Sequence, residues 1–132
     1  GREELINGLV FCNRVLGFVN APALMQHIVQ SLQDASVDME QYAKKRDFLY
    51  NNLTGMGYSI VKPQGAFYMF PRSPIEDDVA FVREIQKHNV RVVPGRGFGA
   101  PGYFRICYCV DDWVIEGSLK RFKTVAKEYG LR

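Results

Sequence analysis

Several features that mark large classes of protein are missing from this sequence. No apolar run approaches the ~18 residues that a membrane-spanning helix needs, so a membrane protein is not expected. The formal net charge of +3 is mild and the basic residues form no dense cluster, so nucleic-acid binding is not expected either. Internal repeats and low-complexity segments are also absent. The 132 residues are enough to bury a real hydrophobic core.

Cysteine is scarce, and its spacing excludes further classes. The sequence has three cysteines, which are Cys12, Cys107 and Cys109. An odd number of cysteines without a C-x-x-C pair argues against a disulfide framework and against a zinc site. We therefore expect the three cysteines to be reduced thiols in a cytoplasmic protein. The two histidines, His27 and His88, have no nucleophile or metal ligand at a useful spacing. Neither a Ser/His/Asp or Cys/His catalytic arrangement nor a metal site is predicted.

Helix and strand signals alternate along the part of the chain that remains. Helices are expected over residues 3–16, 20–32, 38–56, 73–88 and 112–129, and strands over residues 58–61, 66–70, 90–93 and 103–110. This order predicts an α+β fold, with a small, mostly antiparallel sheet and helices packed on one face.

Capping residues mark where several of these helices begin. Asn20 is placed to cap the second helix, and Asp38 and Gln41 have the spacing of a capping box for the third. Ser73 and Pro74 are typical of a helix start, because serine caps and proline fits the first helical position. The core side of the last helix follows from spacings of three and four residues, and it is expected to hold Ile115, Leu119, Phe122, Ala126 and Tyr129.

The strand near the end of the chain carries an arginine on its non-core face. Successive strand side chains point to opposite faces, so one face holds the apolar residues Phe104, Ile106, Tyr108 and Val110. Arg105 lies on the other face with Cys107 and Cys109. A guanidinium held on a rigid strand presents a fixed fork of donors that suits a carboxylate or phosphate. A structural ion pair is the alternative role for Arg105.

A glycine-rich segment precedes this strand, and two familiar interpretations of it fail. Residues 97–102 match G-x-G-x-x-G, but a dinucleotide site needs a helix directly after the glycines, and here a strand follows. Residues 96–99 also resemble the start of an RNA-recognition strand, but Ala100, Pro101 and Gly102 interrupt it. The glycines instead predict a sharp backbone turn toward a ligand.

Two motifs in this order resemble the closing third of class I/II aminotransferases, the fold-type I enzymes that use pyridoxal phosphate. In that family a P-x-G-A-F-Y-x-F strand is followed by a helix, by V-x-P-G-x-x-F-G, and by a strand that contains F-R-I. The corresponding segments are Lys62-Pro63-Gln64-Gly65-Ala66-Phe67-Tyr68-Met69-Phe70-Pro71 and Val92-Val93-Pro94-Gly95-Arg96-Gly97-Phe98-Gly99-Ala100-Pro101-Gly102-Tyr103-Phe104-Arg105-Ile106. The resemblance runs from about Asn20 to the end of the chain.

The resemblance implies which residues bind the substrate. Arg105 would grip the substrate carboxylate, and Gly65 and Phe67 would belong to the same binding site. Along this second segment Ala66, Tyr68 and Phe70 share one strand face and Phe67 and Met69 the other. Strand alternation alone leaves open which of the two faces walls the pocket. No catalytic residue and no cofactor-binding residue is assigned within this chain.

The resemblance also implies what lies outside this chain. The family's cofactor lysine stands in a Ser-x-x-Lys stretch upstream of these motifs, and no lysine here has that context. We therefore expect a C-terminal fragment of a cytoplasmic aminotransferase of amino-acid metabolism, which is inactive alone and binds no pyridoxal phosphate by itself. The resemblance further implies a structural break near residues 35–38, between a helical segment of residues 1–37 and a small domain of residues 38–132. Residues 1–37 would contact the large cofactor domain of the same chain and the partner subunit. The expected partners are therefore an amino acid or 2-oxo acid, that large domain, and a second subunit in a homodimer. The alternative is a non-catalytic α+β module that binds a small carboxylate or a protein partner.

Overall fold

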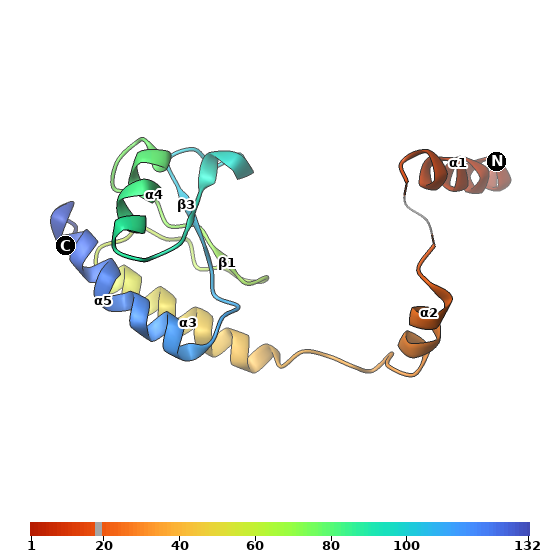
Figure 1. Ribbon diagram of the computed structural model, residues 1–132, viewed down its shortest axis with the longest axis horizontal. Helices are drawn as coiled ribbons and strands as arrows, with labels where there is room; N and C mark the ends of the chain where they lie inside the picture. Colours follow the sequence, from red (N-terminus) through yellow and green to blue (C-terminus); the bar gives the residue numbers. More distant parts are fainter. Residues whose placement is uncertain (18–19) are drawn as a thin grey trace. The chain divides into compact units, whose positions relative to one another are not determined.

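The computed structural model describes residues 1–17 and 20–132, which fall into two units, Gly1–Val37 and Asp38–Arg132 (Figure 1). The first unit contains helices α1 (Arg2–Val15) and α2 (Ala23–Gln30). Neither helix has a buried residue. The N-cap of α2 is Pro22, so the prediction that Asn20 caps this helix is wrong.

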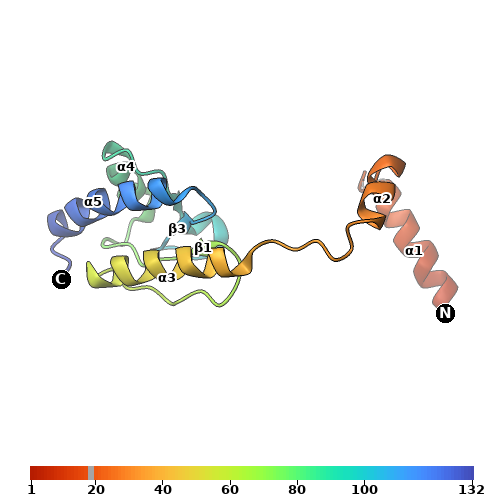
Figure 2. The ribbon, with the colours of Figure 1, turned by 90° about the horizontal axis from the view of Figure 1, so that it is seen from below.

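The second unit contains all of the strands in the described part of the chain. Its elements are α3 (Met39–Gly55), β1 (Tyr68–Met69), α4 (Asp78–Lys87), β2 (Val93–Pro94), the 3₁₀ turn η1 (Gly95–Phe98), β3 (Phe104–Cys107) and α5 (Asp112–Glu128). The strands form a sheet in the order β1-β3-β2, and both pairings are antiparallel. Figures 1 and 2 show α3 and α5 side by side, and α4 packs against β2. The predicted α+β fold is confirmed.

In the second unit, a hydrophobic core joins α3, α4 and α5 to one face of the sheet. Met69, Phe104 and Ile106 point into it from β1 and β3, and Tyr108 follows on the same side. The helices contribute Leu49 and Leu53 from α3, Phe81, Val82 and Ile85 from α4, and Ile115, Phe122, Val125 and Ala126 from α5. Burying a side chain of this size typically contributes ~1.5–3 kcal/mol. The opposite face of the sheet is therefore left for Arg105 and its neighbours.

The core side predicted for the last helix agrees with the structure. Ile115, Phe122 and Ala126 are buried, and Leu119 and Tyr129 pack against the core while partly exposed. The strand predicted before this helix has one exception. Val110 is expected on its core face, but the Val110 side chain is exposed. The cause is that β3 ends at Cys107. Tyr108 still follows the strand alternation, but Val110 lies in a bend before α5, where that alternation no longer holds.

Every predicted strand is shorter or shifted in the structure, and one predicted helix begins later. The strands expected over residues 66–70, 90–93 and 103–110 are observed at Tyr68–Met69, Val93–Pro94 and Phe104–Cys107. The strand expected over residues 58–61 is reduced to an isolated bridge between Ile60 and Pro71, because proline has no N–H to donate to a ladder. The helix expected from Ser73 begins at Asp78 instead. The backbone N–H of Ser73 donates to Gly102 O at 2.8 Å, which commits Ser73 to extended pairing rather than to a helix. Among the described residues, no helix has the length and apolar character required to cross a membrane.

Candidate carboxylate-binding site

Arg105 lies in the middle of the sheet, on the face turned away from the core. It belongs to the central strand β3, where it pairs with Val93 of β2. Its neighbours Phe104 and Ile106 are buried in the core, while the Arg105 side chain is half-buried. Strand alternation predicts this placement. The charged group is thus held by the most fully paired strand of the sheet, with part of its surface open to a ligand.

Two aromatic rings contact the Arg105 guanidinium. Its Cζ atom lies 4.4 Å from the ring centroid of Tyr68 and 4.0 Å from that of Phe98. Phe98 in turn meets the Phe70 ring edge-on, with the centroids 6.0 Å apart. Each cation–π contact typically contributes ~0.5–2 kcal/mol. The rings restrain the guanidinium while leaving its charge uncompensated.

No carboxylate satisfies that charge within the described part of the chain. The side chain of Arg105 donates no hydrogen bond and forms no ion pair there, although a guanidinium carries five N–H donors. Arg96 is the opposite case, since it is bonded to both Asp77 and Asp78. The structural ion pair that was the alternative role for Arg105 is therefore not found among the described residues. A half-buried cation in this state is suited to an external anion.

The predicted site residues Gly65 and Phe67 stand just before β1. Phe67 is 39% exposed, and its ring centroid lies 4.7 Å from that of Tyr68, which links it to the Arg105 cluster. Gly65 is exposed, and no atom lies within 4 Å of the place its side chain would occupy. The structure thus gives Phe67 a contact with the cluster and leaves open space beside Gly65. Their role in binding remains a prediction.

The residue between them has an unusual backbone conformation. Ala66 has a φ of +58°, in the left-handed region that side-chain-bearing residues rarely adopt. The buried hydroxyl of Tyr108 donates a hydrogen bond of 2.9 Å to the Ala66 carbonyl oxygen. This bond ties the segment to the chain just after the end of β3. Strain of this kind is typically kept at functional sites.

The sequence did not single out Phe98, and it left open whether the strand face that holds Tyr68 walls the site. Tyr68 could have been found, because it shares a strand face with Phe70, and Met69 on the other face is fully buried. Because Tyr68 contacts Arg105 and Met69 is in the core, the face of β1 that holds Tyr68 is the one beside Arg105. Phe98 stands in η1, where no strand or helix periodicity predicts its direction. Only its place within the P-G-x-x-F-G motif could have drawn attention to it.

The turn that carries Phe98 is tied to the start of α4. The Asp78 carboxylate is fully buried and accepts hydrogen bonds from the Arg96 backbone N–H at 2.8 Å and from Arg96 Nε at 2.7 Å. Arg96 also donates from its terminal nitrogen to Asp77 at 2.9 Å. The bond from the Arg96 side chain lowers the pKa of Asp78 below its usual value, in spite of the opposing effect of burial. The same bond raises the pKa of Arg96.

The lysines with side-chain contacts in the described residues are engaged elsewhere. Lys44 and Lys87 pair with glutamates on their own helices, and Lys62 pairs with Asp47. Lys45 donates to the Val110 carbonyl at 2.6 Å. None of these contacts involves Arg105 or the rings around it. In the same described ranges, no group of three acidic, cysteine or histidine side chains gathers as a metal site.

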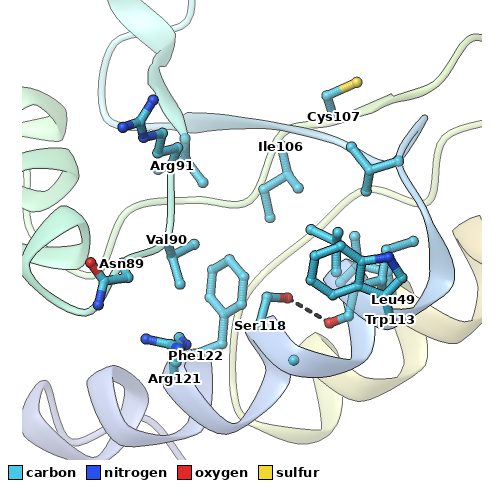
Figure 3. A pocket seen from close by; sticks show the side chains of 15 residues that line it. Leu49, Asn89, Val90, Arg91, Ile106, Cys107, Trp113, Ser118, Arg121 and Phe122 are labelled. Atoms are coloured by element: carbon cyan, nitrogen blue, oxygen red, sulfur yellow. Dashed lines mark hydrogen bonds between the residues drawn. The ribbon is translucent and has the colours of Figure 1, made fainter.

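A separate cavity of about 460 Å³ lies on the core side of the sheet (Figure 3). Leu49, Val90, Ile106 and Phe122 form part of its apolar lining, and Trp113 lies over it from α5. The Ser118 hydroxyl there is bonded to the Ile115 carbonyl oxygen, and Arg121 donates to the carbonyl oxygen of His88. Neither Arg105 nor the aromatic rings around it line this cavity. It is distinct from the predicted carboxylate site.

Comparison with known proteins places this arrangement in a family. Residues 5–122 match the family model described as aminotransferase class I and II. The chain belongs to the class I and II aminotransferase family. It is 37% identical over 100 residues to the aspartate/prephenate aminotransferase of Thermus thermophilus, and the match covers 73% of this chain and 26% of that relative. The sequence-based identification of the family is confirmed.

Solved aminotransferases share the fold. A crystal structure of an aminotransferase from Eubacterium rectale superposes with a TM-score of 0.89 at 40% identity, covering 96% of this chain and 32% of that one. The Thermus thermophilus aspartate aminotransferase with maleate matches 65% of this chain and 23% of its own, with a TM-score of 0.63 at 34% identity. This aminotransferase chain thus spans about a quarter to a third of the length of these relatives.

Proposed function

We propose that this chain supplies the substrate-carboxylate clamp of an aminotransferase that moves an amino group between an amino acid and a 2-oxo acid. The observation that carries the proposal is the Arg105 guanidinium, which is positioned by two aromatic rings and bonded to no acid in the described residues. Family membership supplies the reaction class. Amino acids and 2-oxo acids share an α-carboxylate, so one fixed guanidinium serves both halves of the reaction.

The chemistry of Arg105 favours a carboxylate as its ligand. A guanidinium forms two parallel hydrogen bonds to a carboxylate, which fixes orientation as well as position. Orientation of a bound substrate can supply several kcal/mol of a reaction barrier. A related enzyme of known structure was crystallised with maleate, which is a dicarboxylate. We propose that Tyr68, Phe98 and Phe67 shape the apolar surroundings of the carboxylate, and that Gly65 lets the substrate approach the backbone.

Pyridoxal phosphate is the cofactor that we propose for the complete enzyme. When bound, it serves as an electron sink for the amino-group transfer. The lysine contacts in the described residues do not fit the covalent attachment of this cofactor, because they lie outside the Arg105 cluster. We therefore assign the attachment lysine and the proton transfer to another part of the enzyme. The contribution of this chain is to bind and orient the substrate.

The partners follow from the same proposal. Residues 1–37 would contact the large cofactor domain of the enzyme, and a second copy would complete a homodimer. A cytoplasmic location is consistent with the free thiols of Cys12, Cys107 and Cys109.

The competing proposal is a non-catalytic module that binds a small carboxylate or a protein. An assay of the complete protein distinguishes the two, with an amino-acid donor, a 2-oxo acid acceptor and pyridoxal phosphate present. The aminotransferase proposal predicts a new amino acid formed from the 2-oxo acid, and no product when the 132-residue chain is assayed alone. Carboxylate binding by the complete protein without amino-group transfer would support the module instead.

A further inference from the structure

We propose that Asp78 is a positioning residue for the carboxylate site, acting through Arg96 and η1 to hold the Phe98 ring on Arg105. Asp78 itself does not contact Arg105 through any bond in the described structure. It is a fully buried acid at the start of α4. The positional part of this inference stands on geometry alone, and its effect on substrate binding rests on the proposed function.

The first step is the fixation of η1 by Asp78. One oxygen of this carboxylate accepts a hydrogen bond from the Arg96 backbone N–H at 2.8 Å, and the other accepts one from Arg96 Nε at 2.7 Å. A terminal guanidinium nitrogen of Arg96 lies 2.6 Å from the second oxygen in an ion pair. Both the backbone and the side chain of Arg96 are therefore bound to a single buried group. Hydrogen bonds that involve charged partners are roughly twice as strong as neutral ones. This arrangement fixes the second residue of a four-residue turn.

The second step is the dependence of Phe98 on that turn. Phe98 is the last residue of η1 and is 48% exposed, so the hydrophobic core does not hold its ring in place. The next residue, Gly99, has a φ of +73°, which reverses the chain immediately after the ring. A short 3₁₀ turn has weak internal hydrogen bonding. Its position is instead supported by the Asp78 bonds on one side and, on the other, by the hydrogen bond of 2.8 Å that the Gly95 N–H donates to the Tyr103 carbonyl oxygen, just before β3.

The third step leads from Phe98 to Arg105. The centroid of this ring is 4.0 Å from the guanidinium carbon, closer than the ring of Tyr68. A guanidinium that loses this contact regains rotamer freedom, which a bound carboxylate must then remove again. Such a loss weakens ground-state and transition-state binding alike. It raises KM and leaves kcat nearly unchanged.

Arg96 is not itself a second anion-binding arginine. Its side chain donates to Asp77 and Asp78, so its charge is already matched by two carboxylates. Its Nε and backbone N–H are both used by the buried Asp78. The two acids and the arginine thus form a support for the turn, while Arg105 keeps its donors for the ligand.

The test begins with nuclear magnetic resonance of the 132-residue chain and needs no cofactor. In Asp78→Asn we expect loss of the nuclear Overhauser contacts between the Phe98 ring and the Arg105 side chain, with those of Tyr68 retained. The matched control is Glu84→Gln, which removes a carboxylate from the same helix and breaks an exposed pair with Lys87. Retention of the Phe98 contacts in a folded Asp78→Asn chain would overturn the proposal. If that variant does not fold, Arg96→Lys is measured by the same criterion.

Kinetics of the complete enzyme test the consequence for binding. Asp78→Asn should raise KM about threefold to tenfold with kcat little changed, which is the effect expected from one lost cation–π contact. Combining it with Phe98→Leu should add no further increase, because both changes act on the same contact. A drop in kcat at constant KM would show a merely structural role and refute the proposal. If the wild-type enzyme transfers no amino group, the proposed function fails while the resonance experiment still decides the role of Asp78.

Discussion

At the scale of single residues, Arg96 and Arg105 differ in what surrounds them. Arg96 has two acidic partners and supports a turn, whereas Arg105 has two aromatic neighbours and no acid in the described ranges. A cation paired inside the protein has its donors occupied, and a cation held by rings keeps them available. This contrast is the reason for assigning ligand binding to Arg105 and structural support to Arg96.

The buried Asp78 should make the stability of the second unit sensitive to acid. Its pKa in the folded protein is lowered, chiefly by the Arg96 side chain, so its contribution is fully present above the unfolded value of ~3.9. That contribution is lost as the pH falls through the lower folded pKa. We therefore expect Asp78→Asn to reduce the thermal midpoint at pH 7, and this difference to shrink below about pH 4. Thermal unfolding of both proteins between pH 7 and pH 2 measures it, and a difference that stays constant over this range would contradict the assignment.

At the scale of elements, the close packing of η1 against β3 gives a second prediction. A Cβ at Gly95 would lie 2.7 Å from the Tyr103 carbonyl oxygen and closer still to that of Ala100, whereas a Cβ at Gly97 would meet nothing within 4 Å. Overpacking of a tight site typically costs ~1–3 kcal/mol. For a domain of this size that corresponds to a fall in the thermal midpoint of roughly 4–20 °C.

The pair Gly95→Ala and Gly97→Ala therefore forms a matched test. Both substitutions add one methyl group to the same four-residue turn, and only the first meets backbone atoms. Differential scanning calorimetry should show a large loss of stability for Gly95→Ala and a change of about 0.5 kcal/mol or less for Gly97→Ala. Equal midpoints for the two variants would show that η1 is not packed as described.

The helices were predicted better than the strands, for a physical reason. Helical periodicity is local, so Asp38 could be recognised as the cap of α3 and the core side of α5 could be read from its spacing. Strands depend on partners that are distant in sequence, and Pro71 and Pro94 limit the ladders because they have no N–H. The ladders are accordingly shorter than the apolar runs that predicted them.

The same distinction explains what was predicted of the site. Strand alternation placed Arg105 on the open face without any knowledge of its neighbours. The position of Phe98 depends instead on the bond between Arg96 and Asp78, two residues that are 18 positions apart. No local sequence pattern indicates that Arg96 and Asp78 are bonded to each other. The binding role of Gly65 and Phe67 remains a prediction that substitution must test.

At the scale of the whole molecule, the first unit leaves its apolar side chains without cover. The exposed large apolar residues include Leu5, Leu9 and Phe11 on α1 and Leu24, Ile28 and Val29 on α2. Helices of 14 and 8 residues are marginal alone in water. We therefore expect α1 and α2 either to exchange amide hydrogens rapidly or to drive self-association of the chain.

Sedimentation velocity and hydrogen exchange, measured on the 132-residue chain and on residues 38–132 alone, test this prediction. The shorter chain should remain folded and monomeric, because all of the core residues lie within it. A 132-residue chain that is strictly monomeric and yet fully protected from exchange over residues 1–37 would contradict the expectation.

The central claim, that Arg105 binds the substrate carboxylate, is tested in the complete enzyme by comparing substrates with and without that group. We would measure kcat/KM for an amino acid and for the matching amine with wild-type enzyme, Arg105→Lys and Arg105→Ala, beside the thermal midpoint of each. Loss of a hydrogen-bonded charge typically costs ~2–5 kcal/mol. We expect the lysine variant near the low end, since it keeps the charge without the planar fork, and the alanine variant near the high end. The amine should be affected little, and the midpoints should stay close together. Wild-type turnover of the amino acid by Arg105→Ala, or unfolding of that variant, would show that Arg105 is not the carboxylate clamp.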